Sequence, residues 1–374
     1  MRILSSVWLL VLMAVTAGAQ DTPAHRAQAL EQQGQWSQAE TAWREAIQQK
    51  PADGTAYAHL GLALAHQSEY AEAVTAYRKA LALKANLPGI DLDLGLALFK
   101  QEKLLDAIGP LKAAVAKTPQ NVQAQVLLGM CYYGTAQYAQ ALPYLKAAVA
   151  QSPENLQFRT VLAQSCLWSA HYDCTLEQYH QILAQSPESA EADMLAGEAL
   201  DGENDTSGAI TQFQAAAKAS PNQPNVHFGL GYLYWKQRSF PEAGAEFEQE
   251  LANDPRNVQA LAYLGDIKIK QNDNAAAQQL LEKAVQEHGA PRITYVDLGL
   301  VYAAQRHDDE AVAAFQRAIQ MDPAQVDAHW RLARLYASMG RQQEAKAEFA
   351  KADQLHQKQD EPLVKTISTP PRNE

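Results

Sequence analysis

Residues 295–302 read Tyr-Val-Asp-Leu-Gly-Leu-Val-Tyr, and this stretch belongs to a pattern that returns every 34 residues along the chain. Ten windows of 34, counted from Gln20, fill residues 20–359 without an insertion. Position 8 of every window holds a small residue: Ala27, Gly61, Gly95, Gly129, Ala163, Gly197, Gly231, Gly265, Gly299 and Ala333. Position 20 is alanine in nine of the ten windows, and Thr175 is the exception. Self-similarity at one fixed period predicts a repeat architecture.

The spacing of apolar residues inside each window is helical. Leu60 and Leu64 lie four residues apart, and Leu94 and Leu98 repeat that spacing one window later, as expected for one face of an α-helix. Glycine or serine in mid-window and a proline near the end of seven windows supply the turn signals. The sequence therefore predicts two short helices per window. We expect the small residue at position 8 to let the first helix approach the alanine at position 20 of the second.

This pattern resembles the tetratricopeptide repeat. The signature of that family has an aromatic residue, then Leu-Gly, a tyrosine, a later Ala-x3-Phe and a closing proline, matched after residues 295–302 by Ala311, Phe315 and Pro323. The resemblance spans residues 20–359 and implies an all-α, right-handed superhelical solenoid of ten stacked helix-turn-helix pairs. The fifth window, with Thr175 and Ile182 at positions that are mostly alanine, is degenerate.

The two ends of the chain do not follow the repeat. Residues 1–19 combine a basic start at Arg2, an apolar stretch and the small residues Ala17, Gly18 and Ala19, which is typical of a cleaved signal peptide. A retained membrane anchor is less favoured because the apolar stretch is shorter than the ~20 residues that span a bilayer. We therefore expect an exported protein, periplasmic or secreted, that does not span the membrane after cleavage. The proline-containing residues 360–374 are expected to form a disordered tail.

Composition and motifs argue against several functions. The chain has 31 Lys and Arg against 42 Asp and Glu, a net charge of −11, so nucleic acid is not expected as a partner. The sequence contains no phosphate-binding loop, no His-Glu-x-x-His zinc motif and no Gly-x-Ser-x-Gly elbow. Gly229 and Gly231 lie in a predicted helix and are better explained by repeat packing than by dinucleotide binding. We therefore predict no enzyme activity, no catalytic residue, no metal and no cofactor.

Three further groups of residues have two interpretations each. Cys166 and Cys174 lie on the two helices of one pair, so a disulfide is left open, whereas Cys131 is expected to be a buried core residue. Around Cys174, residues 171–180 contain two histidines and a glutamate, for which a solvated helix face is favoured over a metal site. The run 201–205 is acidic and is expected to be a turn rather than a calcium loop.

The resemblance also implies a binding surface. In tetratricopeptide arrays the first helices line a concave groove, and on this chain the matching positions give the candidate partner-binding residues Phe99, Met130, Tyr133, Trp168, Met194, Phe228, Tyr232, Trp235, Trp330, Arg331 and Arg334. Exposed aromatic residues commonly mark a partner site. Burial of these side chains against one another is the alternative, and it is left open here.

The expected function is a non-enzymatic protein-protein interaction scaffold of the cell envelope or exterior that binds apolar-anchored peptide segments in this groove. Lys and Asn pairs that grip a C-terminal carboxylate in some family members are not matched, so that specificity is not transferred. A carbohydrate-binding or polysaccharide/protein export accessory, with Tyr133, Trp168 and Trp235 stacking on sugar rings, is the alternative. The sequence does not identify the partner or say whether the protein joins a larger envelope assembly.

Overall fold

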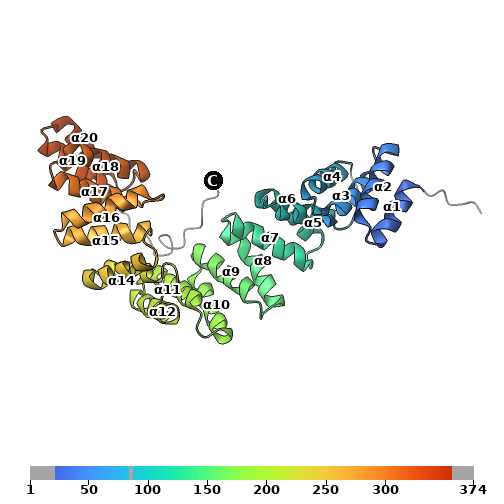
Figure 1. Ribbon diagram of the computed structural model, residues 1–374, viewed down its shortest axis with the longest axis horizontal. Coiled ribbons are helices and arrows are strands. Elements are labelled where there is room, and N and C mark those ends of the chain that lie inside the picture. Colours follow the sequence, from blue (N-terminus) through green and yellow to red (C-terminus); the bar gives the residue numbers. More distant parts are fainter. Residues whose placement is uncertain (1–21, 84–86, 356–374) are drawn as a thin grey trace, which may run out of the picture. The chain divides into compact units, whose positions relative to one another are not determined.

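The computed structural model describes residues 22–83 and 87–355, and within these ranges the chain forms helices and no strands (Figure 1). The signal peptide expected at residues 1–19 and the tail expected at 360–374 lie outside the described residues. Clustering of contacts divides the chain into two compact units, one ending at Gln137 and the other beginning at Tyr138. Each unit is described by itself below.

The first unit contains seven of the described helices. They are α1 (Pro23–Gln32), α2 (Trp36–Gln49), α3 (Gly54–His66), α4 (Tyr70–Ala82), α5 (Ile90–Lys100), α6 (Leu104–Lys117) and α7 (Val122–Gly134).

The second unit contains the remaining helices of the described chain. They are α8 (Tyr138–Gln151), α9 (Leu156–Trp168), α10 (Tyr172–Gln185), α11 (Ala190–Gly202), α12 (Thr206–Ala219), α13 (Val226–Lys236), α14 (Phe240–Asn253), α15 (Val258–Lys270), α16 (Asn274–Gln286), α17 (Arg292–Ala304), α18 (Asp308–Met321), α19 (Val326–Ser338) and α20 (Gln342–Gln354).

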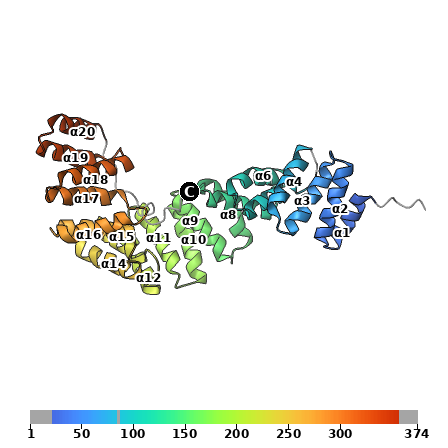
Figure 2. The same ribbon diagram turned by 45° about the horizontal axis from the view of Figure 1, so that its top comes forward.

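Within each unit the helices pack in the order of the chain. The most extensive contacts join the two helices of one repeat, such as α3 with α4 and α11 with α12. The second helix of each pair then packs on the first helix of the next pair, and some first helices also touch each other, as α15 and α17 do (Figure 2). The all-α fold of successive helix pairs predicted from the 34-residue period is confirmed.

The helix starts follow from one window position. In five of the described repeat boundaries position 34 holds a short polar side chain that caps the next first helix: Asp53 accepts hydrogen bonds from the backbone of Thr55 and Ala56 at 3.0 and 3.2 Å, and Asn121 accepts one from Ala124 at 2.9 Å, with Asn155, Ser189 and Asn257 acting in the same way. Such caps satisfy backbone N–H groups that have no partner inside the helix. The proline two residues earlier and this cap together separate one repeat from the next.

The turn between the two helices of a repeat also has one conformation throughout. Position 15 of every window has a positive φ, from 57° at Ala136 to 78° at Gly340, although only Gly34 and Gly340 are glycine there. A left-handed backbone is unfavourable for residues with a side chain. The repeat therefore holds residues as different as Glu102 and Arg238 in a conformation that their own type does not favour.

The small residue at position 8 lies against a large side chain of the second helix. A Cβ atom added to Gly61 would lie 2.7 Å from the ring of Tyr77, and one added to Gly231 would lie 2.6 Å from the ring of Phe247. These rings stand on the second helix at position 24 of the window, four residues beyond the alanine at position 20. The glycine therefore makes space for a large core side chain. At Gly197 an added Cβ atom would also lie 3.3 Å from the carbonyl oxygen of Ala209, the alanine at position 20.

Candidate partner-binding surface

The candidate residues predicted from the sequence all lie on first helices, but they do not form one exposed stripe. Those of the first unit are Phe99 on α5 with Met130 and Tyr133 on α7, and those of the second unit are Trp168 on α9, Met194 on α11, Phe228, Tyr232 and Trp235 on α13, and Trp330, Arg331 and Arg334 on α19. Phe99, Met130 and Tyr133 are each half-buried. Each unit must therefore be considered separately as a binding surface.

A buried carboxylate fixes the start of α13. The residue before the helix, Asn225, has a φ of 65° and its side chain does not cap the helix. Glu250 of α14 takes that role, because its carboxylate accepts hydrogen bonds from the backbone N–H groups of Asn225 and Phe228 at 3.0 and 3.1 Å. Asn257 donates a further hydrogen bond to Glu250 at 3.1 Å. This capping positions the aromatic residues that follow on α13.

The three aromatic side chains of α13 pack into a cluster with α14 and α15. Phe228 lies 5.7 Å from Phe247 and 5.8 Å from Tyr263 between ring centroids. Trp235 meets Tyr263 edge to face at 5.0 Å, and Tyr232 does the same at 5.5 Å. Offset and edge-to-face pairs of this kind add to the stability gained from burial alone.

This cluster corrects part of the predicted surface. Phe228 is 0% and Tyr232 is 2% exposed, so neither ring is open to a partner, and Met194 is buried as well. The alternative of burial against neighbouring side chains holds for these three residues. Tyr263 on α15 packs on Phe228 and Tyr232. The sequence interpretation left Tyr263 out, although it stands at the same window position as Arg331.

Polar contacts link the first helices that carry the cluster. The indole N–H of Trp235 donates to Asp266 at 2.5 Å, and Lys270 forms an ion pair with the same carboxylate at 2.5 Å. One repeat earlier, Lys236 reaches the fully buried carboxylate of Asp201 at 2.9 Å. Asp201 lies in the last turn of α11 and is buried, so within the run 201–205 the expected turn is confined to Glu203 and Asn204. These contacts make the inner side of α11, α13 and α15 a fixed support.

The first helix of the last repeat, α19, displays an aromatic residue openly. Trp330 is 44% exposed, whereas Phe228 and Val296, at the same window position of earlier repeats, are buried. The guanidinium of Arg334 lies 4.7 Å from the centre of the Trp330 ring, within the range of a cation–π interaction. Trp330 and Arg334 therefore form an exposed aromatic and cationic surface, which we call the α19 patch.

Arg331, the third predicted residue of α19, is half-buried and faces a buried acid. Its charge acts on the carboxyl of Asp297 of α17, which is fully buried. Burial raises the pKa of Asp297 well above its ordinary value, the nearby charge of Asp266 raises it further, and Lys270 and Arg331 oppose this shift. Its Oδ2 atom accepts no hydrogen bond from the described residues. Arg331 thus lies close to a buried carboxyl group and does not extend the α19 patch.

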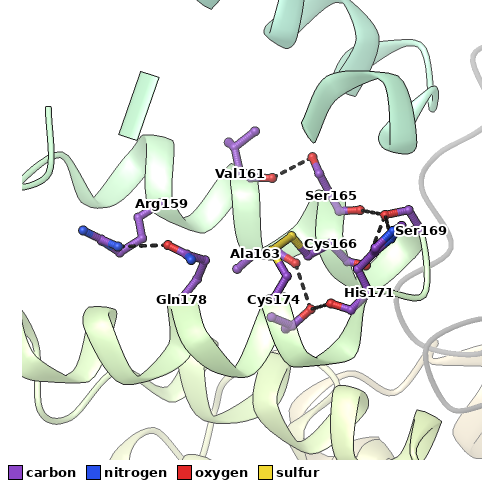
Figure 3. The surroundings of a disulfide bond; sticks show 10 residues. Arg159, Val161, Ala163, Ser165, Cys166, Ser169, His171, Cys174 and Gln178 are labelled. Carbon is purple, nitrogen blue, oxygen red and sulfur yellow. Dashed lines mark hydrogen bonds between the residues drawn. A yellow bond between two sulfur atoms is a disulfide. The ribbon is translucent and has the colours of Figure 1, made fainter. Parts of the chain in front are cut away.

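The fifth repeat contains the disulfide that the sequence left open. Cys166 of α9 and Cys174 of α10 are bonded, with their Cα atoms 5.8 Å apart (Figure 3). Thr175, which replaces the usual alanine, donates its hydroxyl to the carbonyl of Ala163 at 3.3 Å, so the polar substitution is accommodated. Trp168 ends α9 half-buried, with its ring 4.7 Å from that of Tyr138. Cys131 is buried, as expected, and burial raises the pKa of its thiol to about 12.

Among residues 22–83 and 87–355 there is no group of three or more His, Cys, Asp and Glu side chains arranged to hold a metal ion. No helix in the same ranges is both long and apolar enough to cross a membrane.

Successive helix pairs that present side chains from their first helices define a helical repeat protein. Three family models for the tetratricopeptide repeat match this chain, the first at residues 26–88, 92–155 and 227–294, the second at 302–367 and the third at 203–237. The first model alone covers more than half of the sequence. The chain belongs to the tetratricopeptide repeat family, and this fold suggests a protein-protein interaction scaffold.

Solved structures show the same fold. A tetratricopeptide repeat protein from Parabacteroides merdae ATCC 43184 is 20% identical, with a TM-score of 0.52 over 66% of this chain and 96% of that one. A chain of the APC/C hetero-tetramer Cut9-Hcn1 is 14% identical, with a TM-score of 0.52 over 88% of this chain and 72% of that one. At these identities the likeness concerns the fold alone. A comparison with curated proteins gives no significant match.

Proposed function

We propose that this protein is an exported, non-enzymatic scaffold that binds an apolar-anchored segment of a partner protein, with the α19 patch as a principal contact. The observation that carries this proposal is the exposure of Trp330 at 44%. The same window position is buried in the four preceding repeats, at Met194, Phe228, Ala262 and Val296. A large indole left open beside an arginine supplies contact area at low entropic cost, and both residue types are enriched among binding hot spots.

The chemistry of the patch indicates what a partner segment offers. The open ring of Trp330 favours an apolar or aromatic side chain, and the guanidinium of Arg334 favours a neighbouring carboxylate. Trp235 and its neighbours on α13 are held by Asp266 and by Tyr263. We infer that they hold the inner surface of the second unit in shape rather than contacting the partner directly.

Export is proposed from the signal-peptide features of residues 1–19 and is supported by the disulfide between Cys166 and Cys174. Disulfides persist in oxidising compartments such as the periplasm or the cell exterior. Mass measurement of the protein recovered from its native cells tests this proposal. A chain beginning at Gln20 is expected, and recovery of the full-length chain from the cytosol with both thiols reduced would contradict export.

Quantitative capture tests the patch. The mature protein, immobilised at one site, is used to capture and identify its partner from an envelope extract, and the affinity is then measured with the purified partner. Trp330→Ala is expected to weaken binding by more than 1 kcal/mol, about fivefold or more, if the indole is a hot spot. Met321→Ala on α18 removes another exposed large apolar side chain, 41% exposed, and serves as the matched control. Equal affinity of the Trp330→Ala variant and the wild type would move the site elsewhere.

The carbohydrate-binding alternative has less support. It relied on Trp235, whose ring packs edge to face on Tyr263 and whose N–H group is engaged by Asp266, so little of its ring face is left for a sugar. Thermal shift with envelope polysaccharides tests this alternative directly, because a ligand that binds the folded state raises its melting temperature.

A further inference from the structure

Three helices of the first unit enclose a pocket that the sequence did not indicate. It has a volume of about 260 Å³ and lies between α3, α4 and α5. Its walls are mostly apolar, with Leu62, Tyr70 and Leu96 among the lining residues. This volume is below the range of about 300–1,000 Å³ that is usual for pockets holding a drug-sized ligand. The pocket is therefore suited to one large side chain of a partner segment.

One residue of the pocket wall carries a buried hydroxyl group without a hydrogen-bond partner. Tyr77 is 1% exposed and lines the pocket, and its Oη atom has no hydrogen-bond partner among the described residues. The ring cannot easily move away, because it fills the space left open by Gly61. A buried polar atom without a hydrogen bond costs free energy. A ligand that reaches Oη would remove this cost.

A carboxylate lies near this hydroxyl. Asp93 of α5 lines the same pocket and is half-buried, and within residues 22–83 and 87–355 no hydrogen bond or ion pair of its carboxylate is found. Burial raises the pKa of Asp93, while the charge of His66 lowers it. The negative charge of Asp93 also contributes to the raised pKa of Tyr77, after burial as the larger cause. Both groups would be stabilised by a hydrogen-bond donor carrying positive charge.

The basic residues of the pocket do not satisfy this need. His66 is exposed and stacks on Trp36 with ring centroids 3.7 Å apart, which holds it at the mouth. Lys100 is also exposed, so water and salt screen its charge. An anionic ligand held by these two residues would bring negative charge towards Asp93, whereas a cationic one would not.

We propose that this pocket receives a lysine or arginine side chain from a partner protein. The ammonium or guanidinium group donates hydrogen bonds to the Asp93 carboxylate and to Tyr77 Oη, and the aliphatic stem packs between Leu62 and Leu96. Long basic side chains bury their stems in this way while their charge finds a polar group. This second contact rests on the proposed function and lies in the first unit. It requires a positively charged side chain on the partner, which the α19 patch does not.

The test uses three N-acetylated, amidated pentapeptides, Gly-Gly-Xaa-Gly-Gly, in which Xaa is lysine, norleucine or glutamate. Binding to the isotope-labelled mature protein is followed by NMR titration, because a single side chain is expected to bind only weakly. The variants are Asp93→Asn and Tyr77→Phe, which remove the charge or the hydroxyl and keep the shape. Glu72→Gln is the matched control, since Glu72 is an exposed acid on α4, the helix that carries Tyr77, and does not line the pocket.

The expected result is saturable binding of the lysine peptide, with shifts confined to resonances of α3, α4 and α5. Binding should weaken at least tenfold for norleucine and for Asp93→Asn, weaken severalfold for Tyr77→Phe, and stay unchanged for Glu72→Gln. Equal binding of norleucine and lysine, preference for glutamate, or loss of binding in Glu72→Gln would each overturn the proposal. These titrations need no partner protein and do not involve Trp330, so failure here and failure of the α19 patch are distinguished.

Discussion

Glycine at position 8 of a first helix is required by the side chain that faces it. In the seventh repeat, a Cβ atom on Gly231 would stand 2.6 Å from the Phe247 ring, closer than non-bonded atoms approach. Gly244 of the same repeat has a different environment, because its nearest neighbours, Ile267 and Leu264, would be 4.0 Å from an added Cβ atom. Two glycines of one helix pair therefore have opposite tolerance for a methyl group.

The two alanine substitutions are expected to differ in sign. Gly231→Ala should lower the free energy of unfolding by about 1–3 kcal/mol, because overpacking outweighs the gain in helix propensity. Gly244→Ala should raise it by up to about 1 kcal/mol, since only the propensity gain and an ordinary contact remain. Urea denaturation of both variants measures the difference. Stabilisation by both substitutions would show that Phe247 moves aside without cost.

Asp297 gives a pH dependence with a defined sign. Burial is the main reason that its pKa is raised, so the folded chain keeps this proton at pH values where the unfolded chain has lost it. The protonated Asp297 contributes to the stability of the folded chain. This contribution is complete below the ordinary aspartate pKa of about 4, and it is lost as the pH rises through the pKa of Asp297 in the folded chain. Asp297→Asn, which resembles the protonated form, should therefore gain stability relative to the wild type as the pH rises.

Melting temperatures of both proteins between pH 4 and pH 8 test this expectation. The advantage of the variant should grow with pH and exceed about 1 kcal/mol at pH 8, since one unit of pKa shift corresponds to about 1.4 kcal/mol. A variant that is less stable than the wild type at pH 8 would mean that Asp297 is ionised and paired with Arg331 in the folded protein.

Helices α9 and α10 are joined covalently, whereas the other pairs of the described chain rely on packing and hydrogen bonds. The disulfide between Cys166 and Cys174 closes a short loop, with a sequence separation of 8 residues. It lies in the repeat that the sequence marks as degenerate. The cross-link therefore compensates for a helix pair whose core departs from the pattern of its neighbours.

Removal of the cross-link is expected to weaken this pair. The double variant Cys166→Ser and Cys174→Ser should lose about 2–3 kcal/mol, the value that the chain-entropy model gives for a loop of this length. A reductant should lower the melting temperature of the wild type and leave that of the double variant unchanged. Cys131→Ala, which keeps the disulfide, should respond to the reductant as the wild type does. An equal response of the double variant would show that the cross-link does not contribute.

Stability within each unit is carried by contacts between neighbouring helices. In the second unit, the extensive contacts join helices that are one or two places apart in the chain. Such an array behaves approximately as a sum of repeat and nearest-neighbour terms, so that one end can open without the other.

A core substitution in the last repeat should therefore act locally. Leu332 is buried on α19 and packs in one cluster with Phe315 and Tyr336. Leu332→Ala should cost about 2–5 kcal/mol. Hydrogen exchange should become faster in α18, α19 and α20, while α9 and α10 keep their protection. Faster exchange throughout the second unit would instead show that it unfolds as a single cooperative body.

The sequence by itself determined the period, the two helices per repeat and where the turns between them fall, because these depend on residues close together in the chain. It also placed the candidate residues on the correct helices. It could not show which of them are open, since burial of Phe228 and Tyr232 depends on Tyr263, which the next repeat brings over them.

Only the tertiary structure decided the left-handed turns at residues as different as Glu102 and Arg238, and the presence of Asp93 and Tyr77 in the wall of one pocket. In both cases the deciding contacts come from elsewhere in the fold. The positions of the helices depend on the preferences of residues that are close together in the sequence. The exposure of a side chain and the formation of a pocket depend on which neighbouring helices pack against it.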